Sequence, residues 1–163
     1  MSIEAVRKHL GKYGLENKIR EFKESTATVE EAAEVNSCEP ARIAKSLSFI
    51  INDIPTIIVV AGDAKINNQK FKAKFKTKAK MIPGSDVENL IGHPVGGVCP
   101  FGIKDNVKVY LDESMKRFET MLPACGTPNS AIELTLEELE KLPVDELVEK
   151  RYEKFRQMGV FNR

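Results

Sequence analysis

Metal-ligating residues are scarce in this sequence, and those present are poorly spaced for a metal site. Its two histidines, His9 and His93, and its three cysteines, Cys38, Cys99 and Cys125, form no Cys-x-x-Cys pair and no zinc-binding pattern. An odd number of scattered cysteines also argues against the disulfide framework of small secreted domains. We therefore expect no metal, no other cofactor and a cytoplasmic location.

Long apolar runs and the signature loops of common enzyme classes are also missing. Arg7, Lys8 and Lys12 interrupt the N-terminal segment too early for a signal peptide, and no apolar run reaches membrane-spanning length. Walker, GxGxxG, HExxH and GxSxG patterns are absent. These absences count against membrane proteins, nucleotide hydrolases, Rossmann enzymes, zinc peptidases and α/β-hydrolases.

The overall composition is that of an ordinary globular domain. The chain has 163 residues, of which 42% are hydrophobic and 30% charged, and this length is typical of a single domain. Because the formal net charge is only +1, any contact with a nucleic acid must come from a local patch.

Apolar periodicity and capping patterns predict helices interleaved with strands. Three capping-box pairs are present: Thr28 with Glu31, Ser85 with Glu88, and Thr135 with Glu138. We expect helices at about 3–13, 30–35, 41–44, 69–79, 85–91, 135–141 and 145–158. The β-branched and apolar runs 47–51 and 56–61 predict two adjacent central strands joined by a turn. Shorter strands are expected at about 18–23, 80–82, 107–111 and 131–134, with a short helix or an extended segment at 114–121.

This interleaving indicates one domain of the α/β or α+β class over residues 1–163. Residues 145–163 are interpreted as a C-terminal helical extension of that domain.

Lys45 is the first candidate for chemistry. It stands just ahead of the first predicted central strand, where a lysine can be held at the edge of a cleft and bind phosphate or stabilise negative charge. A solvated lysine at a helix end is the alternative that position alone leaves open.

A glycine-rich segment, Gly92–Gly102, is the second candidate. Its backbone N–H groups could form an anion-binding nest or an oxyanion hole, although a tight turn between strands would have the same composition. Cys99 with His93 as its base could form a nucleophilic pair, but a packed thiol is the more common role of such a cysteine.

Two further segments offer binding groups. The loop Cys125–Ser130 carries hydroxyl and amide side chains that suit a polar ligand or an ordinary turn. Lysine occupies every second position from 70 to 80, which suits contact with phosphates or a solvated helix face.

Three segments together resemble, in order and spacing, those of the YbaK and prolyl-tRNA synthetase editing family. They are Ala44-Lys45-Ser46, Gly96-Gly97-Val98-Cys99-Pro100-Phe101-Gly102 and Gly126-Thr127. The resemblance covers about residues 1–142. It implies a mixed, twisted, barrel-like sheet surrounded by helices, and hydrolysis of the ester between a wrong amino acid and its tRNA.

The resemblance also implies site residues. The predicted catalytic set is Lys45, Gly96, Gly97, Val98, Cys99 and Pro100, acting through the lysine and the loop backbone. The predicted substrate-binding set is His93, Phe101, Gly126, Thr127, Asn129 and Ser130. The predicted tRNA-binding set is Lys72, Lys74 and Lys76. In this family the substrate's own ribose hydroxyl or thiol can replace a protein nucleophile.

The expected function is a trans-editing hydrolase acting on tRNA(Pro) that carries a small wrong amino acid such as alanine or cysteine. Aminoacyl-tRNA is the expected partner, with an aminoacyl-tRNA synthetase as a further one, and no membrane or DNA partner is expected. A non-catalytic tRNA-binding module and a hydrolase of free aminoacyl esters are the alternatives.

Overall fold

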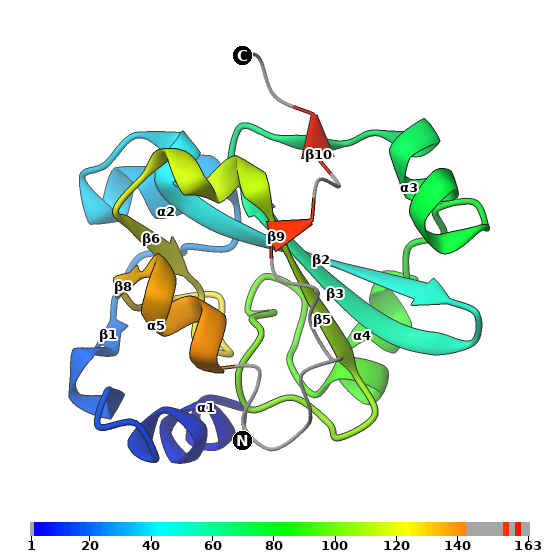
Figure 1. Cartoon of the computed structure of the whole chain (residues 1–163). Helices are drawn as coiled ribbons and strands as arrows, with labels where there is room; N and C mark the ends of the chain where they lie inside the picture. Colours follow the sequence, from blue (N-terminus) through cyan, green and yellow to red (C-terminus); the bar gives the residue numbers. More distant parts are fainter. Residues whose placement is uncertain (1, 143–154, 157–158, 161–163) are drawn as a thin grey trace.

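A six-stranded mixed sheet forms the centre of the computed structural model, which describes residues 2–142, 155–156 and 159–160 (Figure 1). Its strand order is β8-β6-β2-β3-β5-β9. The strands are β8 (Leu134–Thr135), β6 (Thr120–Pro123), β2 (Ile43–Ile51), β3 (Ile54–Ala61), β5 (Lys108–Asp112) and β9 (Phe155–Arg156). Parallel and antiparallel pairs both occur, and helices pack around the curled sheet, which confirms the predicted fold class.

The β2–β3 hairpin is the longest element of the sheet. Its two-residue turn, Asn52 and Asp53, has positive φ angles of 52° and 67°. Two consecutive left-handed residues form the type I′ turn, whose twist matches that of the flanking strands. All of β3 from Ile57 to Ala61 is fully buried, as the apolar run in the sequence predicts.

Two small sheets extend the central one. β1 (Arg20–Glu21) pairs with β7 (Ser130–Ala131), and β4 (Lys65–Ile66) pairs with β10 (Gly159–Val160). The single strand expected at 131–134 is therefore wrong. The chain forms two short strands there, because β7 pairs with β1 whereas β8 pairs with β6.

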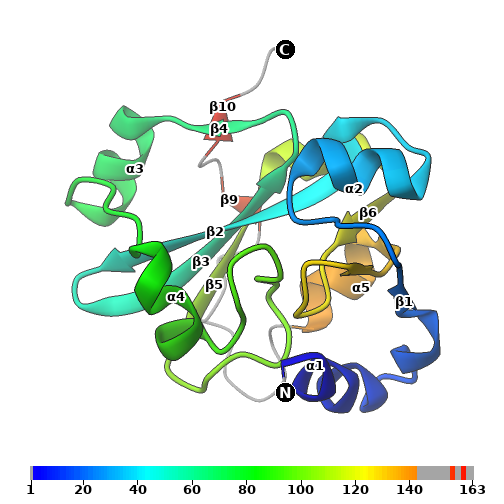
Figure 2. The same ribbon diagram turned by 180° about the vertical axis from the view of Figure 1, so that it is seen from behind.

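Five α-helices and three 3₁₀ segments surround the sheet in the described part of the chain. The helices are α1 (Ser2–Gly11), α2 (Val29–Asn36), α3 (Asn68–Phe75), α4 (Gly84–Ile91) and α5 (Leu136–Lys141). The 3₁₀ segments are η1 (Glu16–Lys18), η2 (Pro40–Arg42) and η3 (Glu113–Arg117). Seen from behind, α2, α4 and the loop after α4 lie in front of the sheet (Figure 2).

The capping predictions have different outcomes. Thr28 caps α2, and Thr135 with Glu138 forms a complete capping box at α5. Ser85 caps nothing, because the chain is still extended at Pro83 and α4 begins directly after it. The residue predicted as a cap thus lies inside the first turn.

Two further helix predictions need correction. The helix at 41–44 ends at Arg42, since Ala44 already pairs with Ala61 on one side and Pro123 on the other. The helix at 145–158 lies largely outside the described residues, and the described pair Phe155–Arg156 is a strand against β5.

Aromatic packing fixes α3 on the sheet. Phe71 packs on Phe49 and Phe75 packs on Tyr110, each with 5.2 Å between ring centroids. These two phenylalanines are one helical turn apart, so they turn one face of α3 inward and leave its lysines outside. A helix is confirmed here, although it ends at Phe75 rather than near residue 79, and the strand at 80–82 shrinks to a single bridge between Met81 and Phe49.

Candidate functional site

A cavity of about 410 Å³ opens beside the first half of β2. Its walls come from β2, from residues 26–32 at the start of α2, from the segment 81–87, from the loop around Val95–Val98, and from the segment 122–131. The lining is mostly apolar, with hydroxyl groups at several points. Of the predicted site residues, the cavity brings together Lys45, Gly96, Val98 and Ser130.

Lys45 lies within β2 rather than ahead of it, opposite Val60 of β3. Its ammonium donates to the carbonyl of Ala64 at 2.7 Å and to that of Gly62 at 3.5 Å. Partial burial lowers the pKa of Lys45, and the charges of Asp63 and Glu30 oppose that shift. An ammonium has three donors, so one remains for a ligand.

The turn that holds Lys45 is itself fixed in place. Arg117 of η3 donates to both carboxylate oxygens of Asp63, which holds the pKa of that carboxyl below its usual range. Gly62 allows a close backbone approach, since a β-carbon there would collide with the Pro40 carbonyl oxygen. Asp63 is therefore an ion-pair residue in a turn, and not an acid aimed at the cavity.

The glycine loop is packed directly against the backbone of the 125–130 loop. A β-carbon on Gly97 would lie 2.5 Å from the backbone nitrogen of Thr127, and Gly126 donates its N–H to the Gly97 carbonyl at 3.0 Å. Gly96 has a φ of +90°, a conformation that suits glycine. Glycine is thus required at position 97 by the close backbone contact and at position 96 by the positive φ angle.

Only part of the predicted N–H cluster is available. The N–H of Gly97 donates to the Pro94 carbonyl at 2.9 Å. Gly96 and Val98 line the cavity, and no hydrogen bond from their N–H groups occurs within the described part of the chain. These two are therefore the backbone donors that a bound anion could meet.

Cys99 and His93 do meet, but not as a nucleophile and its base. Both are fully buried, and Cys99 Sγ lies 3.5 Å from His93 Nε2. That nitrogen is 2.7 Å from the Phe101 carbonyl, so it carries the proton and cannot accept one from the thiol. Burial raises the pKa of Cys99 to about 12 and lowers that of His93.

The remaining predicted substrate-binding residues lie behind the cavity wall. His93 and Phe101 are buried under the glycine loop and, like Gly126, Thr127 and Asn129, are not among the lining residues. Asn129 donates its side-chain amide to the Phe22 carbonyl at 2.8 Å. Their contacts fix the two loops that form the wall.

Ser130 is the member of this set that reaches the cavity. Its hydroxyl interacts with the Thr127 side chain at 2.8 Å and donates to the Thr127 carbonyl at 3.2 Å. Four other hydroxyls line the cavity, those of Thr26, Thr28, Ser46 and Ser48. In the sequence, Thr28 is marked by its capping pattern and Ser46 by the Ala44-Lys45-Ser46 motif. Thr26 and Ser48 carry no such signal and become candidates only from the folded structure.

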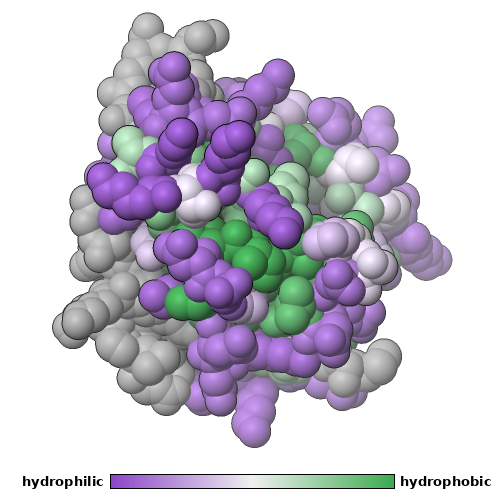
Figure 3. All heavy atoms as spheres, turned by 90° about the vertical axis from the view of Figure 1, so that its right-hand side faces the viewer, coloured by the Kyte–Doolittle hydropathy of each residue, from purple (hydrophilic) through white to green (hydrophobic). Residues whose placement is uncertain are grey.

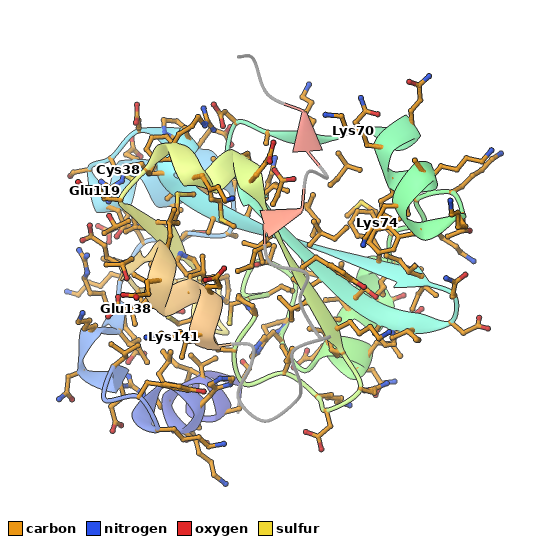
Figure 4. The ribbon with its side chains drawn as sticks, in the orientation of Figure 1. Cys38, Lys70, Lys74, Glu119, Glu138 and Lys141 are labelled. Carbon is orange, nitrogen blue, oxygen red and sulfur yellow. The ribbon has the colours of Figure 1, made fainter. Side chains whose placement is uncertain are left out.

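The predicted tRNA-binding lysines form an exposed surface away from the cavity lining. Lys70 and Lys74 project from α3 (Figure 4), and on this face hydrophilic side chains surround a hydrophobic area (Figure 3). Along the chain, no acidic residue occurs between Asp63 and Asp86. Over that stretch the exposed lysines are Lys65, Lys70, Lys72, Lys74, Lys76, Lys78 and Lys80.

The described residues hold neither a metal-binding cluster nor a membrane-spanning helix. Within 2–142, 155–156 and 159–160, no group of three or more histidines, cysteines or acids could hold a metal ion. None of the helices in this part of the chain is long and apolar enough to cross a membrane.

Comparisons with known proteins agree on one family. The model of the aminoacyl-tRNA editing domain matches residues 23–142. The uncharacterised protein YwhH of Bacillus subtilis (strain 168) is 51% identical over 142 residues, covering 86% of this chain and 90% of YwhH. EbsC of Enterococcus faecalis (strain ATCC 700802 / V583), a proposed Cys-tRNA(Pro)/Cys-tRNA(Cys) deacylase, is 28% identical over 123 residues, covering 74% of this chain and 75% of EbsC.

A solved structure supports the same conclusion. The crystal structure of a proposed trans-editing enzyme for prolyl tRNA synthetase matches with a TM-score of 0.79 at 29% identity. The match covers 87% of this chain and 91% of that one. It confirms the predicted fold class.

The burial of the thiols can be tested by alkylation. At pH 8 we expect iodoacetamide to modify Cys38, which is partly exposed, and to spare Cys99 and Cys125. With a pKa of about 12, roughly one Cys99 thiol in ten thousand is ionised at that pH. Peptide mass spectrometry gives the sites, and urea-unfolded protein, in which all three should react, is the control. Modification of Cys99 in the folded protein at the rate of Cys38 would contradict its burial.

Proposed function

We propose a function for this chain from the fact that it belongs to the family of aminoacyl-tRNA editing domains. It is a trans-editing hydrolase, active in the cytoplasm, that cleaves the ester between a wrong amino acid and its tRNA. The observation that carries this proposal is the cavity whose lining combines Lys45 with two backbone positions, Gly96 and Val98, whose N–H groups donate no hydrogen bond within the described part of the chain.

The substrate we propose is tRNA(Pro) carrying a small amino acid such as alanine or cysteine. The names of EbsC and of the prolyl trans-editing structure support this choice. A mostly apolar cavity of about 410 Å³ also fits a small side chain together with the terminal ribose. Prolyl-tRNA synthetase, which releases such errors, is the proposed protein partner.

In this proposal the reaction is hydrolysis without a protein nucleophile. Water adds to the ester carbonyl carbon, the bond to the ribose oxygen breaks, and the proton passes to that oxygen. An aminoacyl ester is already activated, so orientation and stabilisation of the oxyanion supply much of the acceleration. The substrate's neighbouring ribose hydroxyl orients the water, and the N–H groups of Gly96 and Val98 stabilise the negative charge.

Lys45 has the role of an anchor for the terminal nucleotide. Its ammonium is held by two carbonyls and keeps its charge, so its remaining donor can bind a phosphate or ribose oxygen. The exposed lysines of α3 and its C-cap, including Lys72, Lys74 and Lys76, then attract the tRNA backbone without reading its sequence.

A non-catalytic tRNA-binding module is the second candidate, and the burial of Cys99 favours it because no cysteine among the described residues lines the cavity as a thiol nucleophile. Deacylation of a panel of mischarged tRNAs, with alanine, cysteine and serine on tRNA(Pro) first, separates the two. We expect turnover of at least one member. Binding to tRNA without any change in ester lifetime would favour the module instead.

Lys45→Ala is the variant that ties the turnover to this cavity. It should lose most activity while keeping its melting temperature close to that of the parent, because the side chain contributes little packing. A matched surface variant, Lys108→Ala, should keep full activity. Parental turnover in folded Lys45→Ala protein would place the reaction elsewhere.

The proposed backbone catalysis can be distinguished from thiol catalysis by two substitutions. Gly97→Val should lower the rate by roughly 100-fold or more, because a side chain there collides with Thr127 and displaces the neighbouring N–H donors. Cys99→Ala keeps the loop backbone and should retain substantial turnover. Circular dichroism checks the fold of both. An inactive Cys99→Ala beside an active Gly97→Val would make the thiol the nucleophile.

The lysine surface predicts salt-dependent binding. The affinity for tRNA should fall steeply with added salt, and a triple variant with Lys72, Lys74 and Lys76 changed to Gln should show a flatter dependence. Each phosphate that the variant no longer neutralises reduces the slope of log K against log salt by roughly 0.7 to 0.9. Filter binding over a salt series measures both slopes.

A variant of equal charge provides the control for that experiment. Changing Lys8, Lys12 and Lys23 to Gln removes three charges near α1 and β1, which lie far from α3 in both ribbon views (Figures 1 and 2). This control should keep the parental slope. Equal slopes for the α3 variant and the parent would mean that the α3 lysines are only a solvated face.

A further inference from the structure

One edge of β2 is open where it borders the cavity. The N–H of Ile50 donates to the Lys80 carbonyl, and Ser48 accepts from the N–H of Ile82, both at 3.0 Å. In an antiparallel strand the N–H and C=O of one residue point to the same side, and this side alternates along the chain. Ser46 therefore points its backbone groups away from β3, as Ser48 and Ile50 do.

Nothing in the described part of the chain covers that edge at Ser46. The parallel pairing with β6 ends at Ala44 opposite Pro123, and the bridge to Met81 begins at Phe49. Between them the N–H and C=O of Ser46 have no strand partner, and Ser46 lines the cavity. The gap is therefore a short stretch of unpaired strand edge, the kind of backbone to which an external partner can hydrogen-bond.

The Ser46 side chain carries a third polar group beside this edge. As placed, its hydroxyl oxygen is buried and has no hydrogen-bond partner among the described residues. A buried hydroxyl without a partner costs free energy, so rotation of this short side chain toward the open edge, where a ligand can satisfy it, is favoured.

The charged residues that line the cavity determine which chemical group can bind beside Ser46. Among the described residues that line it, Lys45 is the only charged one, and none is an acid. Lys45 donates to protein carbonyls and cannot accept a hydrogen bond. The α-ammonium of a bound aminoacyl ester therefore has to find neutral oxygens.

We propose, resting on the function proposed above, that Ser46 is the specificity residue for the substrate's free α-amino group. Its unpaired carbonyl oxygen and its unpartnered hydroxyl accept hydrogen bonds from the ammonium, while Lys45, the preceding residue, anchors the nucleotide. The protein then selects aminoacyl esters whose amino group is free, and rejects N-acylated ones, in which a bulky amide replaces the ammonium.

Non-hydrolysable amides of 3′-amino-3′-deoxyadenosine test this proposal independently of turnover. Three ligands are compared by NMR titration: the alanyl amide, its N-acetyl derivative, and the propionyl amide, which lacks the amino group. Because a hydrogen bond to a charged group changes affinity by roughly 10- to 100-fold, the parent should bind the alanyl amide at least tenfold more tightly than the other two.

Two substitutions assign the preference to Ser46. Ser46→Ala should reduce the alanyl-over-propionyl ratio at least threefold, whereas Ser46→Thr, which retains the hydroxyl and suits a strand, should preserve most of it. Ser85→Ala removes an exposed hydroxyl that caps nothing and does not line the cavity, so it should leave the ratio unchanged.

The outcomes separate this proposal from the proposed function. Equal affinities for the alanyl and propionyl amides, no binding of any of them, or an unchanged ratio in Ser46→Ala would overturn the role of Ser46, even if the parent deacylates mischarged tRNA. A clear amine preference that depends on Ser46, in a protein that hydrolyses none of the tRNA panel, would support the recognition site and reject the hydrolase.

Discussion

Eight residue pairs join β2 to β3, from Ala44 opposite Ala61 to Ile51 opposite Ile54. A slip of one residue in this register would exchange the two edges and the two faces of β2. Lys45 would lose the carbonyls that hold it, and Ser46 would point its backbone into the ladder instead of toward the cavity. The type I′ turn sets the register at one end, and the buried β3 residues maintain it along the strand.

The opposite wall of the cavity depends on contacts between backbones rather than side chains. Gly97 lies against Gly126 and Thr127 so closely that neither loop could move without the other. Beneath them, Cys99, His93 and Phe101 form a buried polar contact that fills space and has no access to a ligand. A rigid wall of this kind suits a reaction in which the protein orients an activated ester and supplies donors.

Much of the scaffold was predictable from local patterns. The apolar runs of β2 and β3, the caps at Thr28 and Thr135, and the glycine at the end of α4 all act within a few residues. The ordered motifs identified the family and pointed to the cavity residues Lys45, Gly96 and Val98.

What could not be predicted depends on partners distant in sequence. The division of 130–135 into two strands requires β1 and β6 as partners, and the burial of His93 and Phe101 follows from how the glycine loop folds over them. The open edge at Ser46 exists only because β6 stops at Pro123 and the chain returns at Met81. In the sequence, Ser46 is one hydroxyl residue in a largely apolar strand, and nothing beside it indicates that the strand edge is unpaired at this position.

The way in which Lys45 is held has an electrostatic consequence. Its ammonium rests on the carbonyls of Gly62 and Ala64, while Asp63, the carboxylate between them, is bound by Arg117. Carbonyl dipoles orient a cation without cancelling its charge, because the potential of a dipole decays more steeply with distance than that of an ion. The described residues that line this apolar cavity include no carboxylate, and an apolar surrounding screens charge poorly. The cavity lining therefore presents one positive charge with no negative charge among the described residues to oppose it, which favours a ligand that carries negative charge itself.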